Sequence, residues 1–357
     1  LLDSDDPSPQ AHDFMALTIH TLLAALYARI AAAAEALAAP GAVLMLGGAA
    51  LHGDLAALAG RIAARTGCRL VAQFFCARID RGAGAVAIEH LPYPVEACVE
   101  ALSGMRHMVC VGEAPPVAFF AYPGLPSTPE PAGATIDRLC PAEGDIGWTL
   151  AEIARAVGVT EADAPARIAR ALPDAPTGPL DADAVGRALA RHLPEGAIAV
   201  NEALTADAAI WPHVDRAARH TRLNITGGSI GQALPLTIGA AMACPERPVV
   251  AVSGDGSAMY QVQSLWTMAR ERLNATVLIL SNGGYRILHR ELDHLGLPPA
   301  GKNASAMFDI ADPGLGWVAL ARGHGVPGAR AETAEALDAA LTAAAEIDGP
   351  FLIEVVL

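Results

Sequence analysis

The sequence predicts an α/β protein built from two doubly wound domains, each with a parallel sheet. Short apolar runs alternate with helical patterns along most of the chain, which is typical of buried parallel strands covered by helices. The 357 residues suffice for two domains of about 150 residues each. A stretch with three prolines at 171–184 interrupts the alternation, so we place the domain boundary there.

Residues 1–40 are expected to form a linker and a lead-in helix. The opening LLDSDDPSPQ is polar and proline-containing, and residues 1 to about 20 are predicted to be a tail. The alanine-rich segment 22–39 has high helix propensity and ends at Pro40-Gly41. Arg29 and Glu35 interrupt its apolar character and acidic residues precede it, so we expect neither a signal peptide nor a membrane span.

Residues 41–170 are predicted to form the central domain. The apolar run AVLMLGG at 42–48 is followed by a helical pattern and by a second apolar run, CRLVAQFF at 68–75, which together indicate a βαβ unit. Further strands are expected at 107–113 and 115–123, and a helix at 149–158.

Residues 171–357 are predicted to form a second, larger α/β domain. Its expected strands are GAIAV at 196–200, PVVAVSG at 248–254, ATVLILSN at 275–282 and PFLIEVV at 350–356. Ligands of such sheets bind at the carboxyl ends of the strands, so the residues at strand ends are the candidates for chemistry.

The composition excludes several classes of protein. The chain has 24 basic and 38 acidic residues, a net charge of -14 and no basic block, so nucleic acid is not an expected partner. The 6 cysteines form neither a CxxC pair nor a Cys/His cluster, which argues against a zinc site or a disulfide framework and favours a cytoplasmic location.

One strand end carries a candidate metal and phosphate site. Asp255-Gly256-Ser257 follows an apolar run and opens a helix, where free N–H groups attract phosphate. Gly-Asp-Gly is by itself also a common tight turn, but Asn282 ends the next apolar run 27 residues later. A crossover of that length brings both residues to the same sheet edge, where carboxylate and amide oxygens suit Mg²⁺ between protein and diphosphate.

Two further segments complete the pattern: the loop Gly227-Gly228-Ser229-Ile230-Gly231 before a helical pattern, and Asn201-Glu202-Ala203-Leu204-Thr205. Each alone is an ordinary helix start. Together with GDG and the later asparagine, they resemble the C-terminal domain of the thiamine-diphosphate enzymes that include acetolactate synthase, pyruvate decarboxylase and benzoylformate decarboxylase. Residues 41–170 resemble the middle domain of that superfamily.

This resemblance implies specific roles. It makes Asp255 and Asn282 side-chain ligands of Mg²⁺, with the Gly284 carbonyl as the third protein ligand. The residues that match diphosphate contacts are Thr205, Gly256, Ser257 and Tyr260. Ile230 matches the residue that bends the cofactor into a V, and the Gly228 carbonyl would accept a hydrogen bond from the pyrimidine 4'-amino group. The bend lets the amino group activate the thiazolium carbon, which then adds to a 2-oxo acid.

The sequence departs from the family in three ways. The N-terminal pyrimidine-binding domain, which supplies an activating glutamate, is absent from these residues, so we expect this chain alone to be inactive unless a separate pyrimidine-binding domain joins it. RILHRELDHLG follows the metal loop without the Gln-Trp pair of acetolactate synthases. FAD is conceivable by family analogy, but LGGAALHGD lacks the GxGxxG spacing that would support it.

We therefore expect a thiamine-diphosphate- and Mg²⁺-dependent 2-oxo acid decarboxylase or carboligase resembling acetolactate synthase, working as a homodimer or homotetramer. One alternative is a non-catalytic cofactor-binding subunit or fragment. The other is a nucleotide-dependent oxidoreductase, for which the sequence lacks a GxGxxG turn followed by a ribose-binding acid. His289 and His294 are candidates for proton transfer, although histidines on a polar helix are more often only solvated.

Overall fold

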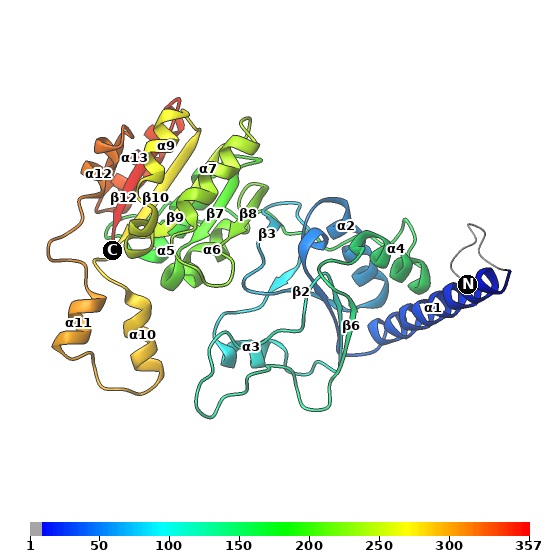
Figure 1. Cartoon of the computed structure of the whole chain (residues 1–357). Helices are drawn as coiled ribbons and strands as arrows, with labels where there is room; N and C mark the ends of the chain where they lie inside the picture. Colours follow the sequence, from blue (N-terminus) through cyan, green and yellow to red (C-terminus); the bar gives the residue numbers. More distant parts are fainter. Residues whose placement is uncertain (1–8) are drawn as a thin grey trace, which may run out of the picture. The chain divides into compact units, whose positions relative to one another are not determined.

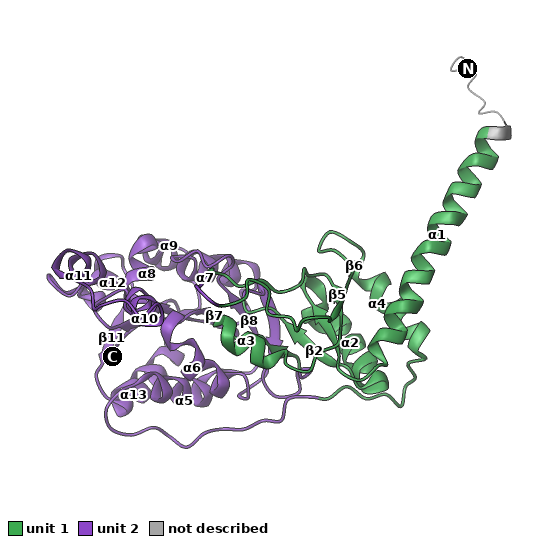
Figure 2. Ribbon diagram, turned by 90° about the horizontal axis from the view of Figure 1, so that it is seen from below, with its two compact units in different colours: residues 1–74, 88–121, 125–166 green, residues 75–87, 122–124, 167–357 purple. Residues whose placement is uncertain are grey.

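The computed structural model describes residues 9–357, and the part of the predicted tail at 1–8 lies outside them. The chain divides into two compact units (Figure 2). Unit 1 contains residues up to 74, 88–121 and 125–166, and unit 2 contains 75–87, 122–124 and 167–357. The domains were predicted at 41–170 and 171–357, and the assignment of residues 75–87 to the second unit was not predicted.

Within residues 9–357, unit 1 consists of a five-stranded sheet and four α-helices (Figure 1). Its helices are α1 (Pro9–Leu37), α2 (Gly53–Thr66), α3 (Val95–Ala101) and α4 (Ile146–Val157), with a short 3-10 turn η1 (Gly48–Leu51). Its strands are β1 (Ala42–Leu46), β2 (Arg69–Ala72), β4 (Glu89–His90), β5 (His107–Val111) and β6 (Thr135–Cys140). The strand order is β4-β2-β1-β5-β6, and every pairing is parallel.

The helix α1 begins earlier than the sequence analysis predicted. A tail was expected up to about residue 20, whereas the helix starts at Pro9. Proline suits the first helical position because it needs no N–H partner there, and the alanine- and leucine-rich residues that follow favour helix. Side chains in its first half are exposed, including those of Phe14, Leu17 and Leu22.

The same helix is long and apolar enough to cross a membrane, by length and composition alone. The segment Ala11–Leu37 has a mean hydropathy of 1.5, and 6% of its most apolar window is buried. Core helices of soluble proteins and signal sequences meet this criterion as well. The criterion therefore does not assign the helix to a membrane.

The strand predicted at 115–123 does not form, so that expectation was wrong. The segment runs as an irregular loop in which the Ala118 N–H donates to the Ser127 carbonyl at 2.7 Å. Its prolines, Pro115, Pro116 and Pro123, have no N–H to donate to a neighbouring strand, which explains why the apolar composition does not produce one.

Unit 2 is a seven-stranded sheet with the order β11-β12-β10-β9-β7-β8-β3. Its strands are β3 (Arg78–Arg81), β7 (Ile198–Glu202), β8 (His220–Asn224), β9 (Val249–Gly254), β10 (Ala275–Ser281), β11 (Gly328–Ala331) and β12 (Phe351–Val356). Its helices are α5 (Ala182–His192), α6 (Asp207–Val214), α7 (Ala233–Ala243), α8 (Asp255–Ala258), α9 (Ser264–Arg270), α10 (Arg286–His294), α11 (Lys302–Phe308), α12 (Trp317–Gly323) and α13 (Ala334–Ala345). Two 3-10 turns, η2 (Leu204–Ala206) and η3 (Met259–Gln261), complete it.

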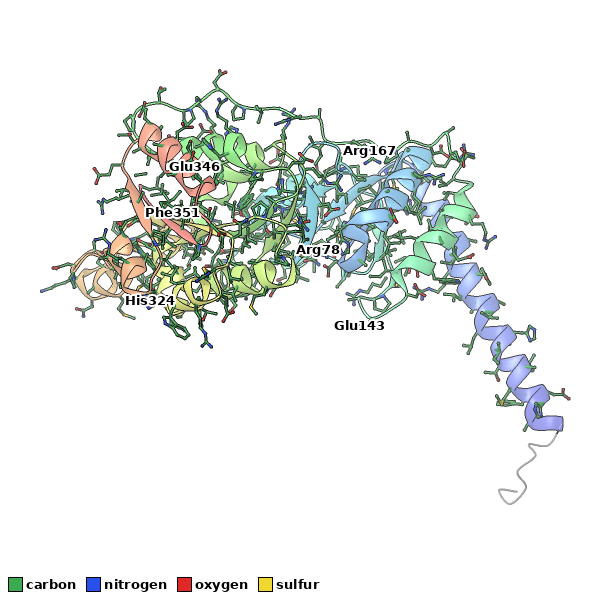
Figure 3. All side chains as sticks on the ribbon, turned by 90° about the horizontal axis from the view of Figure 1, so that it is seen from above. Arg78, Glu143, Arg167, His324, Glu346 and Phe351 are labelled. Carbon is green, nitrogen blue, oxygen red and sulfur yellow. The ribbon has the colours of Figure 1, made fainter. Side chains whose placement is uncertain are left out.

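One edge of this sheet comes from an unexpected part of the chain. The strand β3 lies in sequence between two segments of unit 1, yet it pairs antiparallel with β8, and Arg78 lies opposite Leu223. Arg78 is labelled in Figure 3. The other pairings are parallel, so the sheet is parallel with one antiparallel edge strand.

Helices cover both faces of the seven-stranded sheet, as the predicted doubly wound fold requires. Along β10, Leu278 and Leu280 pack on one side with α5, α6 and α13. Val277 and Ile279 pack on the other side with α7, α9 and α12. Because side chains alternate along a strand, a strand buried on both faces must be apolar at every position, and this is the continuous run that the sequence shows.

Candidate functional site

The candidate site lies where the strand order of the second sheet reverses. From β7 the chain first passes to β8 on one side and then returns to β9 on the other side. The loops that leave β7 and β9 at their carboxyl ends diverge there, and open α/β sheets bind ligands in that crevice. Glu202 ends β7, Asp255 follows β9 and Asn282 follows β10, so the predicted motifs meet at this edge.

Asp255 joins the two predicted metal-binding loops. Its side chain is 2% exposed. Its Oδ1 accepts a hydrogen bond from the Gly256 N–H at 2.8 Å, and Oδ2 accepts from the N–H groups of Asn282 at 3.0 Å and Gly283 at 2.7 Å. The carboxylate therefore fixes the end of β10 against the end of β9. Burial raises the pKa of Asp255, and these backbone hydrogen bonds act in the opposite direction.

The loop after Asn282 has the local structure that its glycines predict. Gly283 has φ of +72°, a left-handed conformation that glycine adopts without strain. The Asn282 Oδ1 accepts a hydrogen bond from the Gly284 N–H at 3.2 Å. The neighbouring segment holds this loop, since the Ile310 N–H donates to the Gly283 carbonyl at 2.8 Å.

A cavity of about 310 Å³ opens at these strand ends. Seven of the nine site residues proposed from the sequence line it, namely Thr205, Ile230, Asp255, Gly256, Ser257, Asn282 and Gly284. They come from four separate segments that lie between 205 and 284 in the chain. The fold therefore brings the separate motifs together, as the strand-end argument requires.

Gly228 and Tyr260 are not among the described residues that line this cavity. Gly228 is half-buried, with φ of +63°. The side chain of Tyr260 is 58% exposed and hydrogen-bonds Tyr285. Their assigned roles remain predictions.

The cavity wall fits a phosphate-bearing ligand. The Ser257 Oγ is buried and has no hydrogen-bond partner among the described residues, so it is a donor available to a ligand. Gly256 is packed closely by the protein itself, because a Cβ at this position would lie 2.6 Å from the Tyr285 ring. Asp255, Asn282 and the adjacent backbone carbonyls are oxygen donors of the kind that Mg²⁺ takes.

Glu202 organises the site, a role that was not predicted from the sequence. It is 1% exposed, and its Oε1 accepts from the N–H groups of Gly231 at 2.7 Å and Gln232 at 3.0 Å. Its Oε2 accepts from the Ser253 hydroxyl at 2.6 Å. The carboxylate thus ties the 227–231 loop to β7 and β9. An acidic residue at the end of the apolar run GAIAVNE is the signal that could have identified it.

The turn that carries Thr205 is strained. Leu204 has φ of +50°, which is uncommon for a residue with a branched side chain. Such strain persists where surrounding contacts enforce it, and it clusters at functional sites. One of these contacts is the Arg290 Nη1, which donates to the Thr205 carbonyl at 3.1 Å.

A second cavity, of about 560 Å³, adjoins the first along the metal loop and α10. Thr205, Asn282, Gly284 and Arg286 line both cavities. His289 also lines the second cavity, where its Nε2 lies 3.3 Å from the Asp309 Oδ1. His294 instead packs against the ring of Tyr122 at 4.2 Å between centroids. Of the two histidines considered from the sequence, one therefore faces the site.

Residues 206–355 match the family model of the thiamine pyrophosphate enzyme C-terminal TPP-binding domain. The chain is 39% identical over 292 residues to a Mycobacterium tuberculosis protein named as an acetolactate synthase large subunit, IlvX, covering 82% of this chain and 56% of that protein. It is 35% identical over 217 residues to benzoylformate decarboxylase of Pseudomonas aeruginosa, covering 59% and 39% respectively. The chain thus spans about half the length of the first of these relatives and less of the second.

Two solved structures are similar to this chain in fold. A thiamine diphosphate-dependent 4-hydroxybenzoylformate decarboxylase of Rhodococcus jostii superposes with a TM-score of 0.72 at 26% identity, covering 91% of this chain and 63% of that chain. Benzoylformate decarboxylase of Polynucleobacter necessarius shares the fold, with a TM-score of 0.71 at 20% identity and coverage of 93% and 64%. The chain is a relative of thiamine-diphosphate-dependent enzymes. The relatives named above are of the acetolactate synthase and benzoylformate decarboxylase type, and the residues that match the TPP-binding family model lie in unit 2.

Proposed function

We propose that this chain binds the diphosphate of thiamine diphosphate together with Mg²⁺ and takes part in the decarboxylation of a 2-oxo acid. The carbanion formed by decarboxylation is transferred to a proton or to a second carbonyl compound. The observation that carries the proposal is the meeting of Asp255, Ser257 and Asn282 around one cavity at the switch point of the sheet. Bound there, the cofactor would supply an electron sink for the carbon–carbon bond cleavage.

Each residue has a definite task in this proposal. Asp255 and Asn282 hold the metal through their side-chain oxygens, and Gly284 contributes a carbonyl oxygen. The Ser257 hydroxyl and the N–H groups at the start of α8 bind phosphate oxygens. Ile230 stands in the cavity wall as an apolar support for the cofactor. Glu202 holds the loop that presents it.

Turnover needs more than these residues. In the proposed scheme a pyrimidine-binding domain, in the same or another polypeptide, supplies the glutamate that activates the pyrimidine ring. A homo-oligomeric assembly is part of the proposal, and exposed apolar side chains on unit 2, Met242, Tyr260 and Trp266, support it. Light scattering of the purified chain measures that assembly directly.

The test measures consumption of pyruvate and of benzoylformate by the chain with Mg²⁺ and thiamine diphosphate. We expect little turnover from the chain alone and turnover once a pyrimidine-binding domain from a related enzyme is supplied, with none for Asp255→Ala. Cofactor binding is followed in parallel by thermal unfolding. Binding without turnover under every combination would identify a cofactor-binding subunit instead, and the absence of binding would contradict the proposal.

A further inference from the structure

The cofactor cavity has an unusual balance of charge. The described residues that line it include two carboxylates, Asp181 and Asp255, and one cationic side chain, Arg286. Asp181 is engaged as the N-cap of α5, its Oδ1 accepting from the Ala184 N–H at 2.7 Å. A diphosphate brings several negative charges, and a divalent cation shared with Asp255 neutralises only part of them. The cavity therefore needs a further positive group if it binds a diphosphate.

Arg286 is placed to be that group. It is the first residue of α10, a helix of 9 residues, and it is exposed. It lines both cavities together with Thr205, Asn282 and Gly284, so it stands at their junction beside the metal loop. The free N–H groups and the positive partial charge of a helix N-terminus lie at the same place.

The guanidinium of Arg286 is not used by the protein itself. No hydrogen bond, ion pair or ring contact joins its side chain to another residue in the described part of the chain. The neighbouring Arg290 differs, because it donates to the Thr205 carbonyl and so has a structural role. An unpaired guanidinium beside a cavity whose other charged lining residues are carboxylates indicates an anionic ligand, and a planar fork of donors suits phosphate and carboxylate oxygens.

We propose that Arg286 binds the terminal phosphate of the cofactor and supplies the positive charge that the metal leaves uncompensated. This inference rests on the proposed function, which places the diphosphate in the same cavity. The other oxyanion that could reach the junction is a substrate carboxylate. The two sources predict different effects, because only the first makes the affinity for the cofactor depend on Arg286.

The experiment is calorimetric titration of the full chain, in the presence of Mg²⁺, with thiamine diphosphate and with thiamine monophosphate. For Arg286→Gln we expect about tenfold weaker binding of the diphosphate, or about 1.4 kcal/mol, and a change below about twofold for the monophosphate. Arg286→Lys retains the charge and should recover part of the loss. The control is Arg322→Gln, an exposed arginine on α12 that lines neither cavity, and it should bind like the wild type.

Three results would overturn the inference. Equal affinity of the wild type and Arg286→Gln for the diphosphate would exclude the contact. If Arg286→Gln bound the cofactor as tightly as the wild type but bound pyruvate more weakly in the same titration, the arginine would be assigned to a substrate carboxylate. A wild-type chain that binds neither thiamine phosphate would contradict the proposed function itself, and the inference with it. The unfolding temperature without ligand shows that each variant is folded.

Discussion

Replacement of Glu202 tests how the site is organised. Glu202→Ala removes the acceptor of three hydrogen bonds, from the N–H groups of Gly231 and Gln232 and from the Ser253 hydroxyl. A buried donor left without a partner costs about 1–3 kcal/mol. Burial raises the pKa of Glu202, because taking the charged carboxylate out of water costs free energy. Removing the carboxylate removes this desolvation cost and offsets part of the loss.

Together these effects predict that Glu202→Ala lowers the free energy of unfolding by about 2–3 kcal/mol. The loss is limited because Gln232 is only partly buried, so water can reach its N–H group. For a domain of 150–250 residues this corresponds to a fall in unfolding temperature of about 4–12 °C. Glu202→Gln retains an oxygen that can accept both N–H bonds, so its loss should be nearer 1 kcal/mol. Glu346→Ala, at an exposed position (Figure 3), should change stability by no more than about 0.5 kcal/mol.

The assay is urea unfolding followed by circular dichroism, with the thermal transition as a second measure. The predicted order of stability is wild type and Glu346→Ala, then Glu202→Gln, then Glu202→Ala. The reasoning would be refuted if Glu202→Ala matched the wild type. It would also be refuted if Gln and Ala at 202 were equally destabilising, since hydrogen-bond acceptance would then not be the source of the stability.

Three other changes have expected outcomes. Gly256→Ala should destabilise by about 1–3 kcal/mol in urea unfolding, because its Cβ would lie 2.6 Å from the Tyr285 ring, and a double variant with Tyr285→Ala should show the two effects to be non-additive. Asp215→Ala should cost about 3–5 kcal/mol in the same assay, since its carboxylate accepts two hydrogen bonds of 3.0 Å from the buried Arg222, and a loss below 1 kcal/mol would contradict this. Burial lowers the pKa of His220, so the unfolded chain binds more protons than the folded chain below pH 6.5, and stability should decrease as the pH is lowered through that range, by at most about 1.4 kcal/mol per pH unit. His220→Gln should flatten this dependence, and an unchanged slope would remove His220 as its source.

The sequence predicted the strands of both sheets best where they are buried on both faces. The apolar runs at 42–48, 248–254 and 275–282 contain β1, β9 and β10. It missed β3 and β8, whose charged residues Arg81 and Arg222 are buried against Asp215, because a pattern of apolar residues cannot reveal strands that bury paired charges. A strand was wrongly predicted at 115–123, because the prediction used the apolar composition and did not consider that the prolines of this segment have no N–H group to donate to a neighbouring strand.

The candidate site was predictable where chemistry depends on a residue at a strand end. Asp255 and Asn282 were placed together by the length of the crossover between them, and the structure joins them through the Asp255 carboxylate. Glu202 and Arg286 had no assigned role, because their importance depends on which loops the fold brings next to them. That information is three-dimensional, and spacing along the chain does not contain it.

The most direct test of the proposed site is calorimetric titration of the chain with thiamine diphosphate, with and without Mg²⁺, for the wild type and for Asp255→Ala. The proposed site predicts one cofactor bound per chain only when Mg²⁺ is present, and loss of that binding in Asp255→Ala while the variant remains folded. Binding that needs no Mg²⁺, or that survives in Asp255→Ala, would contradict the metal-diphosphate site.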